Sequence, residues 1–296
     1  MIIRHPEKIN NPINPIKKKP NWIRTKILNT QNYFETNTII NKKKLHTVCK
    51  EANCPNITEC WSKKHATFMI MGDICTRACA FCNIKTGRPG IVDKDEPQKI
   101  AKTVFELGLK HVVVTSVDRD DLEDGGASHF FQCVEEIKKL DNKVTIELLV
   151  PDFQRKKNAL NIIAECGLDV FNHNLETIPR LYKEIRRGAD YSHSLNILKK
   201  IKSLNNDIWT KSGLMVGLGE NINEIFDVMH DMRENNVDFI TIGQYLQPSK
   251  KHIPVIKFVE PDKFSVLKEK GLSLGFTVVE SGPLVRSSYH AEKHLF

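Results

Sequence analysis

The chain has 296 residues, of which 40% are hydrophobic and 27% are charged, as in an ordinary soluble globular protein. No apolar run approaches the roughly 18 residues that a membrane span needs, and the N-terminus has no apolar stretch like that of a secretory signal. We therefore expect a cytoplasmic protein without a membrane partner. The net charge is +8 and is concentrated in residues 1–64, which have 13 Lys or Arg against 4 Asp or Glu.

Residues 1–45 are rich in Asn, Lys and Pro, and they predict an irregular, wrapping N-terminal extension instead of a domain. Two lysine triplets, at residues 17–19 and 42–44, make this extension basic. A basic segment suits an acidic partner surface, either a nucleic acid or an acidic protein. A solvated leader of biased composition is an equally good interpretation.

A different pattern begins near Thr67, where short apolar runs alternate with stretches of helical periodicity. The apolar runs cover residues 67–72, 111–117, 144–150, 169–175, 212–218 and 238–243, and helical spacing marks residues 97–108, 130–140 and 223–236. Continuous apolar strands that alternate with helices predict a parallel sheet covered by helices.

The number of these units predicts an α/β fold with a partial (βα)6 barrel, because a complete eight-stranded barrel needs roughly 250 residues. A doubly wound sheet is the alternative. However, the first strand leads into a cysteine loop without a G-x-G-x-x-G phosphate signature. We therefore expect a partial barrel over residues 65–250, preceded by a cysteine segment over residues 46–64 and followed by a C-terminal segment over residues 251–296.

Six of the eight cysteines lie within 34 residues, in two groups of three. The groups are Cys49, Cys54 and Cys60, spaced C-x4-C-x5-C, and Cys75, Cys79 and Cys82, spaced C-x3-C-x2-C. Disulfides suit neither a cytoplasmic chain nor groups of three. The remaining cysteines, Cys133 and Cys166, fall in helical patterns and are expected to be buried apolar residues.

Metal binding explains the groups of three better. Structural zinc prefers four ligands, usually in two C-x2-C knuckles, and only one knuckle is present here, although Cys49 or His46 would supply a fourth ligand. Iron–sulfur clusters fit better, because iron in these clusters prefers soft thiolate ligands. Three thiolates on a four-iron cluster leave one iron open to another ligand.

The group at residues 75–82 follows the first predicted strand and resembles the radical S-adenosylmethionine (SAM) superfamily, whose motif is C-x3-C-x-aromatic-C. Phe81 is the aromatic residue of the motif. The resemblance implies a 4Fe-4S cluster on Cys75, Cys79 and Cys82, with SAM bound at the open iron and cleaved to a 5′-deoxyadenosyl radical. Such a cofactor is needed to abstract hydrogen from an unactivated carbon.

A longer resemblance, from roughly residue 20 to the end, is to the lipoyl synthase family. It is carried by "TVCKEANCPNITECW", "ATFMIMGDICTRACAFCNIKTGRP", "VTSVDRDDLEDGGASHF", "FNHNLET", "TKSGLMVGLGE" and the C-terminal "GPLVRSSYHA". The resemblance implies an auxiliary 4Fe-4S cluster that serves as the sulfur source. Its implied ligands are Cys49, Cys54, Cys60 and Ser288, with Ser287 as the other candidate serine.

The family resemblance also implies the reaction and its partners. Two sulfurs would enter at C6 and C8 of an octanoyl-lysine on an acidic carrier domain, either an E2 subunit of a 2-oxoacid dehydrogenase or the glycine cleavage H protein. The expected electron donor is a flavodoxin or a ferredoxin. We expect no nucleic-acid partner and a monomer, and the basic extension would help to dock the carrier.

Further residues follow the predicted strands and resemble family positions that contact SAM or the reacting chain. They are Ser116, Asp118, Asn172, Glu176 and Arg187. A supporting hydrogen bond or a strand cap is the alternative for each, and Arg186 is an equal candidate to Arg187 on spacing alone. The turn "MVGLGE" at 215–220 resembles a SAM-side loop, but an ordinary strand-to-helix turn explains it equally well.

Two rival functions remain open from the sequence. A radical SAM methylthiotransferase acting on tRNA also uses two clusters, but its auxiliary cysteines are widely spaced in a larger N-terminal domain, for which this chain has no room. A zinc-dependent nucleic-acid-binding module with a basic leader belongs to a different class. Visible iron–sulfur absorption that dithionite bleaches would separate the two classes.

Overall fold

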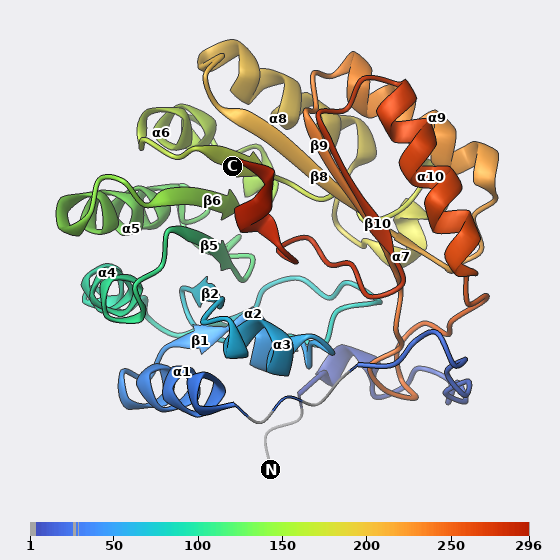
Figure 1. The fold of residues 1–296 in the computed structure, drawn as a ribbon, viewed down its shortest axis with the longest axis horizontal. Helices are drawn as coiled ribbons and strands as arrows, with labels where there is room; N and C mark the ends of the chain where they lie inside the picture. The colour runs from blue at the N-terminus through green and yellow to red at the C-terminus, as the bar shows by residue number, and fades with distance from the viewer. Residues whose placement is uncertain (1–3, 26–27, 29, 296) are drawn as a thin grey trace.

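A computed structural model describes residues 4–25, 28 and 30–295, and a single eight-stranded sheet lies at its centre (Figure 1). In chain order the strands are β1 (His46–Thr47), β2 (Thr67–Ile70), β5 (His111–Ser116), β6 (Thr145–Leu149), β7 (Val170–Asn172), β8 (Trp209–Val216), β9 (Phe239–Gln244) and β10 (Val278–Gly282). Their order across the sheet is the same. Only β1 pairs antiparallel, with β2, and the other neighbours are parallel.

The six strands predicted from the apolar runs are confirmed, as β2 and β5 to β9. Strand β8 begins three residues earlier than expected, at Trp209. The apolar pattern did not predict this start, because Thr210 and Lys211 are polar. Both residues are nevertheless completely buried. Lys211 forms an ion pair with the buried Glu147 of β6, at 2.9 Å between Nζ and Oε2.

The strand order never reverses along the sheet, which argues against the doubly wound alternative, because a doubly wound sheet requires a reversal. In the described part of the chain, the edge strands β1 and β10 do not pair with each other, so the sheet is open. This arrangement agrees with a partial barrel. It differs from the expected six strands in one respect, since β10 adds a seventh parallel strand from the segment expected only as a C-terminal extension.

Helices connect successive strands and lie along the outer side of the curved sheet (Figure 1). They are α4 (Glu96–Leu107), α5 (Ala127–Leu140), α6 (Ala159–Glu165), α8 (Tyr191–Leu204), α9 (Ile222–Glu234) and α10 (Pro261–Ser273). Local sequence explains their limits. Helix α4 starts with a proline in its first turn and ends at Gly108 in the left-handed region, while Asn221 and Glu224 form a capping box on α9. The three predicted helices are therefore confirmed.

The N-terminal extension is less irregular than expected. Residues 31–42 form helix α1 (Gln31–Lys42), which begins where Thr30 Oγ1 accepts a hydrogen bond from Tyr33 N at 3.2 Å. The helix buries Ile40, and its Asn and Lys residues face outward, so its periodicity is weak in the sequence. It packs near α2 (Val48–Glu51) and α3 (Ile57–Ser62), the two short helices of the expected cysteine segment.

Residues 11–17 run along the surface beside residues 250–256. Asn14 N donates to Lys250 O at 2.8 Å, and Lys251 Nζ donates to Asn11 O at 2.6 Å. Lys17 Nζ donates to Ile256 O at 2.8 Å. The beginning of the chain is therefore held against a segment more than 200 positions away in sequence.

After β10 the chain crosses the inner side of the sheet (Figure 1) and ends in the short helix η4 (Ala291–His294). The His294 ring contacts Phe239 at the start of β9, with 6.0 Å between ring centroids. The C-terminal segment thus lies inside the curve of the sheet, where the R-S-S-Y residues approach the strand ends and the Cys49 group. No helix in the described part of the chain is long and apolar enough to cross a membrane.

Candidate functional site

The loop that carries Cys75, Cys79 and Cys82 lies directly after β2, at the carboxyl ends of the parallel strands. It is bounded by a small parallel strand pair, β3 (Ile74–Cys75) and β4 (Lys85–Thr86). Cys75 Sγ lies 3.4 Å from Asp118 Oδ2 and accepts a hydrogen bond from Asp118 N at 3.3 Å. The three thiols are free and lie near enough for the charge of Cys82 to act on both of the others.

Burial raises the pKa of all three thiols, for Cys79 to about 12. A metal must therefore displace three protons when it binds here as a thiolate complex. The donor set fits a 4Fe-4S cluster, because one loop supplies three soft ligands near enough for their charges to interact. Two buried polar atoms at the adjacent strand ends, Ser116 Oγ and Asn172 Oδ1, have no hydrogen-bond partner among the described residues, as expected where a polar ligand is to bind.

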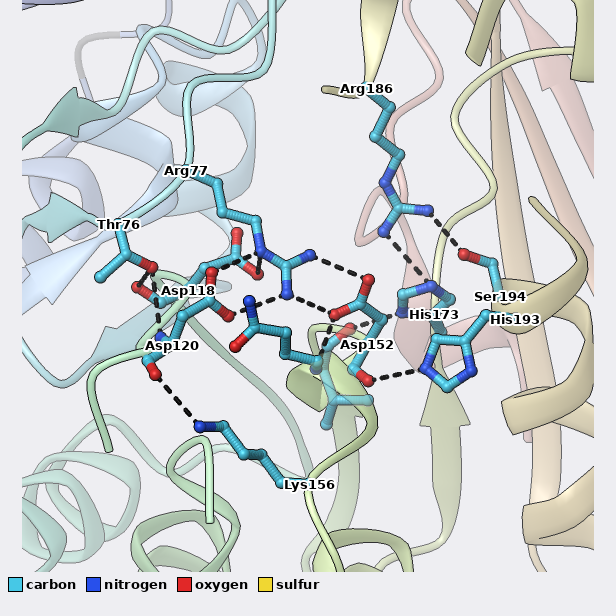
Figure 2. A network of polar contacts seen from close by, with 12 residues as sticks. Thr76, Arg77, Asp118, Asp120, Asp152, Lys156, His173, Arg186, His193 and Ser194 are labelled. Atoms are coloured by element: carbon cyan, nitrogen blue, oxygen red, sulfur yellow. Dashed lines mark hydrogen bonds and ion pairs between the residues drawn. The ribbon is translucent and has the colours of Figure 1, made fainter. Parts of the chain in front are cut away.

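A guanidinium inside the cysteine motif fixes the loop to the neighbouring strand ends (Figure 2). Arg77 forms two hydrogen bonds with Asp120, both 2.8 Å, and two with Asp152, at 2.9 and 2.6 Å. Burial would raise the pKa of Asp152, but the Arg77 guanidinium overrides it and holds that pKa well below its usual range. This double bidentate contact was not predicted, because only the fold brings the loops after β2, β5 and β6 together.

Replacement of Arg77 by glutamine is expected to lower the affinity of the loop for the cluster expected from the sequence by about 10- to 100-fold, the usual cost of losing a group that orients metal ligands. The carboxylates of Asp120 and Asp152 would lose their shared cation, and the loop would lose its anchor. Iron content per chain after anaerobic reconstitution measures the effect. Arg155→Gln is the matched control, because Arg155 is exposed. Full iron loading of Arg77→Gln would contradict the anchoring role.

The half-buried Arg186 guanidinium points toward His173 and Ser194 (Figure 2), and its charge acts on the Cys79 thiol. It donates to Tyr182 Oη at 2.7 Å and lies 3.2 Å from His173 Nε2. Burial, followed by the charge of Arg186, lowers the pKa of His173 to about 3. His173 is therefore neutral, its Nδ1–H donates to Val150 O at 2.9 Å, and its Nε2 accepts from Arg186.

The predicted site residues are placed as follows. Ser116 and Asn172 end strands β5 and β7, and Asp118 follows β5 and contacts Cys75. Glu176 has a positive φ of 68°. Burial raises the pKa of its carboxyl group, although the nearby charge of Arg186 acts in the opposite direction. Arg187 is exposed, whereas its neighbour Arg186, the alternative on spacing, acts on both Cys79 and Glu176.

Two other predicted features are also located. Phe81 is partly buried and packs against the core. The "MVGLGE" turn joins β8 to α9, as a strand-to-helix turn would, and its Gly217 has a φ of 96°. A Cβ atom on Gly217 would lie 2.3 Å from the backbone oxygen of Lys257, so only glycine fits there.

The second cysteine group is brought together by two short helices. Cys49 lies on α2, Cys54 follows it, and Cys60 lies on α3. Burial, followed by the nearby thiols, raises the pKa of Cys49 to about 11 and that of Cys60 still further. Cys54 N donates to Cys49 O at 3.0 Å, which closes the turn between the helices. These three thiols are therefore near enough for their charges to act on one another.

The C-terminal R-S-S-Y residues lie against this second group. Asn56 Nδ2 donates to Leu284 O at 2.7 Å, and Tyr289 Oη donates to Glu59 Oε2 at 3.1 Å. Burial raises the pKa of the Cys54 thiol, and the charge of the half-buried Arg286 guanidinium acts in the opposite direction. The contact joins residues that are about 230 positions apart, which the sequence alone does not reveal.

The two serines of the motif have different partners. Ser287 Oγ accepts from Asn172 Nδ2 at 2.8 Å and donates to Asn174 Oδ1 at 3.0 Å. Ser288 Oγ accepts from Thr67 Oγ1 at 2.8 Å. The backbone of Thr67 also forms a hydrogen bond with the Cys49 thiol, so Ser288 lies on the side of the second cysteine group.

Together, the open, mostly parallel sheet and the loop after β2 define an α/β fold that gathers three thiols at the carboxyl ends of its strands. The radical SAM superfamily model matches residues 69–232, which is more than half of the chain. The chain belongs to the radical SAM superfamily. Membership implies a 4Fe-4S cluster and SAM, and it favours iron over zinc for the Cys75 group.

Solved structures of other superfamily members resemble this fold. Methylornithine synthase (PylB) has a TM-score of 0.54 and 18% identity, with 73% of this chain and 71% of that chain covered. SuiB of Streptococcus suis, bound to its precursor peptide SuiA, has a TM-score of 0.57 and 12% identity, with 90% and 57% covered. HydG, a maturase of the FeFe hydrogenase, has a TM-score of 0.52 and 12% identity, with 91% and 68% covered. At these identities the likeness shows the fold alone.

Proposed function

We propose that this chain is a lipoyl synthase. In this reaction two sulfurs enter at C6 and C8 of an octanoyl chain that is amide-linked to a lysine of a carrier domain. The proposal needs two clusters, SAM and a low-potential electron donor such as a flavodoxin or a ferredoxin. The superfamily accounts for the first cluster and for SAM, and the second cysteine group is the basis for the rest.

The observation that carries the proposal is the contact between the second cysteine group and the R-S-S-Y motif. Three thiols and one serine hydroxyl offer a cluster four protein ligands of which one is hard and weak. A weak oxygen ligand suits a cluster that is dismantled when it donates sulfur. The position of Ser288, bonded to Thr67 beside Cys49, supports Ser288 as that ligand, whereas the two asparagines hold Ser287 elsewhere.

Hydrogen bonds hold the two cysteine groups next to each other, which sulfur transfer between them would require. Asn83, next to Cys82, donates through Nδ2 to Glu51 O on α2 at 3.3 Å, and Arg4 bridges the two segments by donating to Asn83 O at 2.7 Å and to Glu51 O. These bonds hold the helix that carries Cys49 against the Cys75 loop. A substrate chain that reaches one group is therefore near the other, as sulfur insertion at a newly formed carbon radical requires.

The residues around the Cys75 loop suit the methionine end of SAM, which carries both an ammonium and a carboxylate. Glu176 and Arg186 both act on Cys79, so groups of opposite charge flank this thiol. Arg186 would hold the SAM carboxylate, while Asp118 and Glu176 would accept from its ammonium or ribose hydroxyls. When bound, the Cys75 cluster supplies the electron that cleaves SAM, and the second cluster supplies the sulfur.

An anaerobic single turnover with SAM, dithionite and an octanoyl-lysyl peptide tests the function by mass spectrometry of the peptide. The expected product gains two sulfurs and, as the closed dithiolane ring, loses two hydrogens. Formation of 5′-deoxyadenosine without sulfur in the peptide would refute the substrate and direct the search to other acceptors, tRNA first. If neither product forms while iron and sulfide analysis shows intact clusters, the proposal fails.

The basic N-terminal extension is proposed to help to dock the acidic carrier. Lys18, Lys19, Lys42 and Lys44 are exposed and therefore face solvent. Changing these four residues to glutamine is expected to weaken carrier binding and to flatten its salt dependence, because rim charges act mainly through screened attraction. Titration of an octanoylated carrier domain at two salt concentrations measures both effects.

Lys263 and Lys268, which are exposed on helix α10, provide the control. Their double change to glutamine lowers the net charge without altering the extension, and carrier binding should be nearly unchanged. Equal weakening by both sets would mean that only the net charge matters. Unchanged binding in the extension variant would refute its docking role.

A further inference from the structure

Lys8 is a buried lysine in the N-terminal segment, with only 3% of its surface exposed. It lies in the short helix η1 (Pro6–Lys8), and its side chain points to the Cys75 loop instead of solvent. Lysine is almost never fully buried unless a specific partner compensates it. The burial of this side chain in an otherwise exposed basic segment therefore calls for an explanation.

The partner is the backbone of a cluster ligand. Lys8 Nζ donates to Cys82 O at 3.0 Å, and His252 Nε2 donates to the same oxygen at 2.9 Å. Burial, followed by the charge of Lys8, lowers the pKa of His252 to about 4, so this imidazole is neutral. Its Nδ1 accepts from Ser249 Oγ at 2.7 Å. Lys8 thus places a cation beside Cys82, while the adjacent imidazole carries no charge.

The positive charge of Lys8 is only partly balanced by a nearby carboxylate. Glu7 is the only carboxylate within 4.0 Å of Lys8 Nζ in the described part of the chain, with 3.5 Å to its Oε1. Its side chain is 28% exposed, whereas that of Lys8 is 4% exposed, so water screens the anion more than the cation. Glu7 is also held by a hydrogen bond from Thr86 Oγ1, at the end of the same loop. Among the charged groups that act on Cys82, Lys8 is the cation, and the carboxylates of Glu176 and Asp118 oppose its effect.

We propose that Lys8 raises the reduction potential of the cluster held by Cys75, Cys79 and Cys82, acting as a positioning residue through the Cys82 backbone and its own charge. One-electron reduction adds one negative charge to the cluster, and a buried cation nearby stabilises the reduced state. The electron comes from a low-potential one-electron donor. The inference rests on the superfamily's cluster and is independent of the proposed lipoyl substrate.

The test is an anaerobic redox titration of the reconstituted full-length protein, followed by electron paramagnetic resonance with and without SAM. The signal that SAM alters identifies the Cys75 cluster when both clusters are present. Lys8→Met is expected to make the midpoint potential of the Cys75 cluster more negative. The expected change is on the order of tenfold in the reduction equilibrium constant, which for one electron corresponds to about 59 mV. Lys8→Arg should restore most of the shift, because it keeps the charge.

Two further variants separate charge from structure. Glu7→Gln removes the counter-charge and should shift the midpoint in the opposite direction, to a more positive value. Lys17→Met alters an exposed lysine of the same segment and should leave the midpoint unchanged. An unchanged midpoint in Lys8→Met with full iron content would overturn the proposal, as would equal shifts in Lys8→Met and Lys8→Arg. If Lys8→Met does not load iron, an unchanged midpoint in Glu7→Gln overturns it.

These outcomes are distinct from failure of the proposed function. The midpoint is measured without an octanoyl substrate, so the proposed redox role of Lys8 holds or fails whatever the chain acts on. Conversely, wild-type protein that inserts no sulfur leaves the titration informative.

Discussion

Cys79→Ala is expected to abolish SAM cleavage, with no 5′-deoxyadenosine formed after addition of dithionite. Cys79 is the central thiol of the C-x3-C-x2-C loop, and the charges of Asp118, Glu176 and Arg186 act on it. Its loss removes one of the three thiolate ligands, and the motif contains no other cysteine that could replace it. Chromatography of deoxyadenosine measures the activity, and with the proposed second cluster also loaded, iron analysis should show loss of about half of the iron.

Cys133→Ala is the matched control, because it makes the same change at a completely buried cysteine of helix α5, away from both groups. It should retain full iron content and full deoxyadenosine formation, with only the moderate loss of stability that a small core cavity causes. Deoxyadenosine production by Cys79→Ala at the wild-type rate would show that another residue completes the cluster.

Cys54→Ala is expected to separate the two halves of the proposed reaction. The Cys75 loop remains intact, so deoxyadenosine should still form, but the peptide should gain no sulfur. Cys54 lies on the turn between α2 and α3 and faces Arg286 of the R-S-S-Y motif. Mass spectrometry of the octanoyl peptide and chromatography of deoxyadenosine from the same reaction measure both outcomes.

Cys166→Ala provides the control for this second variant, since Cys166 is a buried cysteine at the end of helix α6. It should insert sulfur as the wild-type protein does. Lipoyl product from Cys54→Ala would refute the role of the second group as a sulfur source. Loss of deoxyadenosine in Cys54→Ala would instead mean that the variant damages the whole site.

The sequence predicted the elements of the sheet well because buried parallel strands read as continuous apolar runs. It predicted the start of β8 poorly, since Lys211 is a charged residue whose burial depends on Glu147 in another strand. Helix α1 was missed for a related reason. Its Asn-rich and Lys-rich sequence shows little periodicity, and its burial depends on packing against α3.

For the site, spacing alone grouped the cysteines, because three thiols within eight or twelve residues are confined to one neighbourhood by the chain itself. Spacing failed to choose between Arg186 and Arg187, since adjacent residues differ in direction and only packing reveals which side chain turns inward. The structure places Arg186 inward, bonded to Tyr182 and His173, and leaves Arg187 exposed.

By itself, the sequence determined six strands and three helices, the two groups of three thiols and the uneven charge, because each depends on neighbouring positions. The tertiary structure alone decided which distant residues meet: Arg77 with Asp152, Ser288 with Thr67, and Lys8 with Cys82. These contacts span 75, 221 and 74 positions. Local patterns carry no record of such pairs, because the pairs form only when the sheet brings separate loops to one end and the chain termini fold back over it.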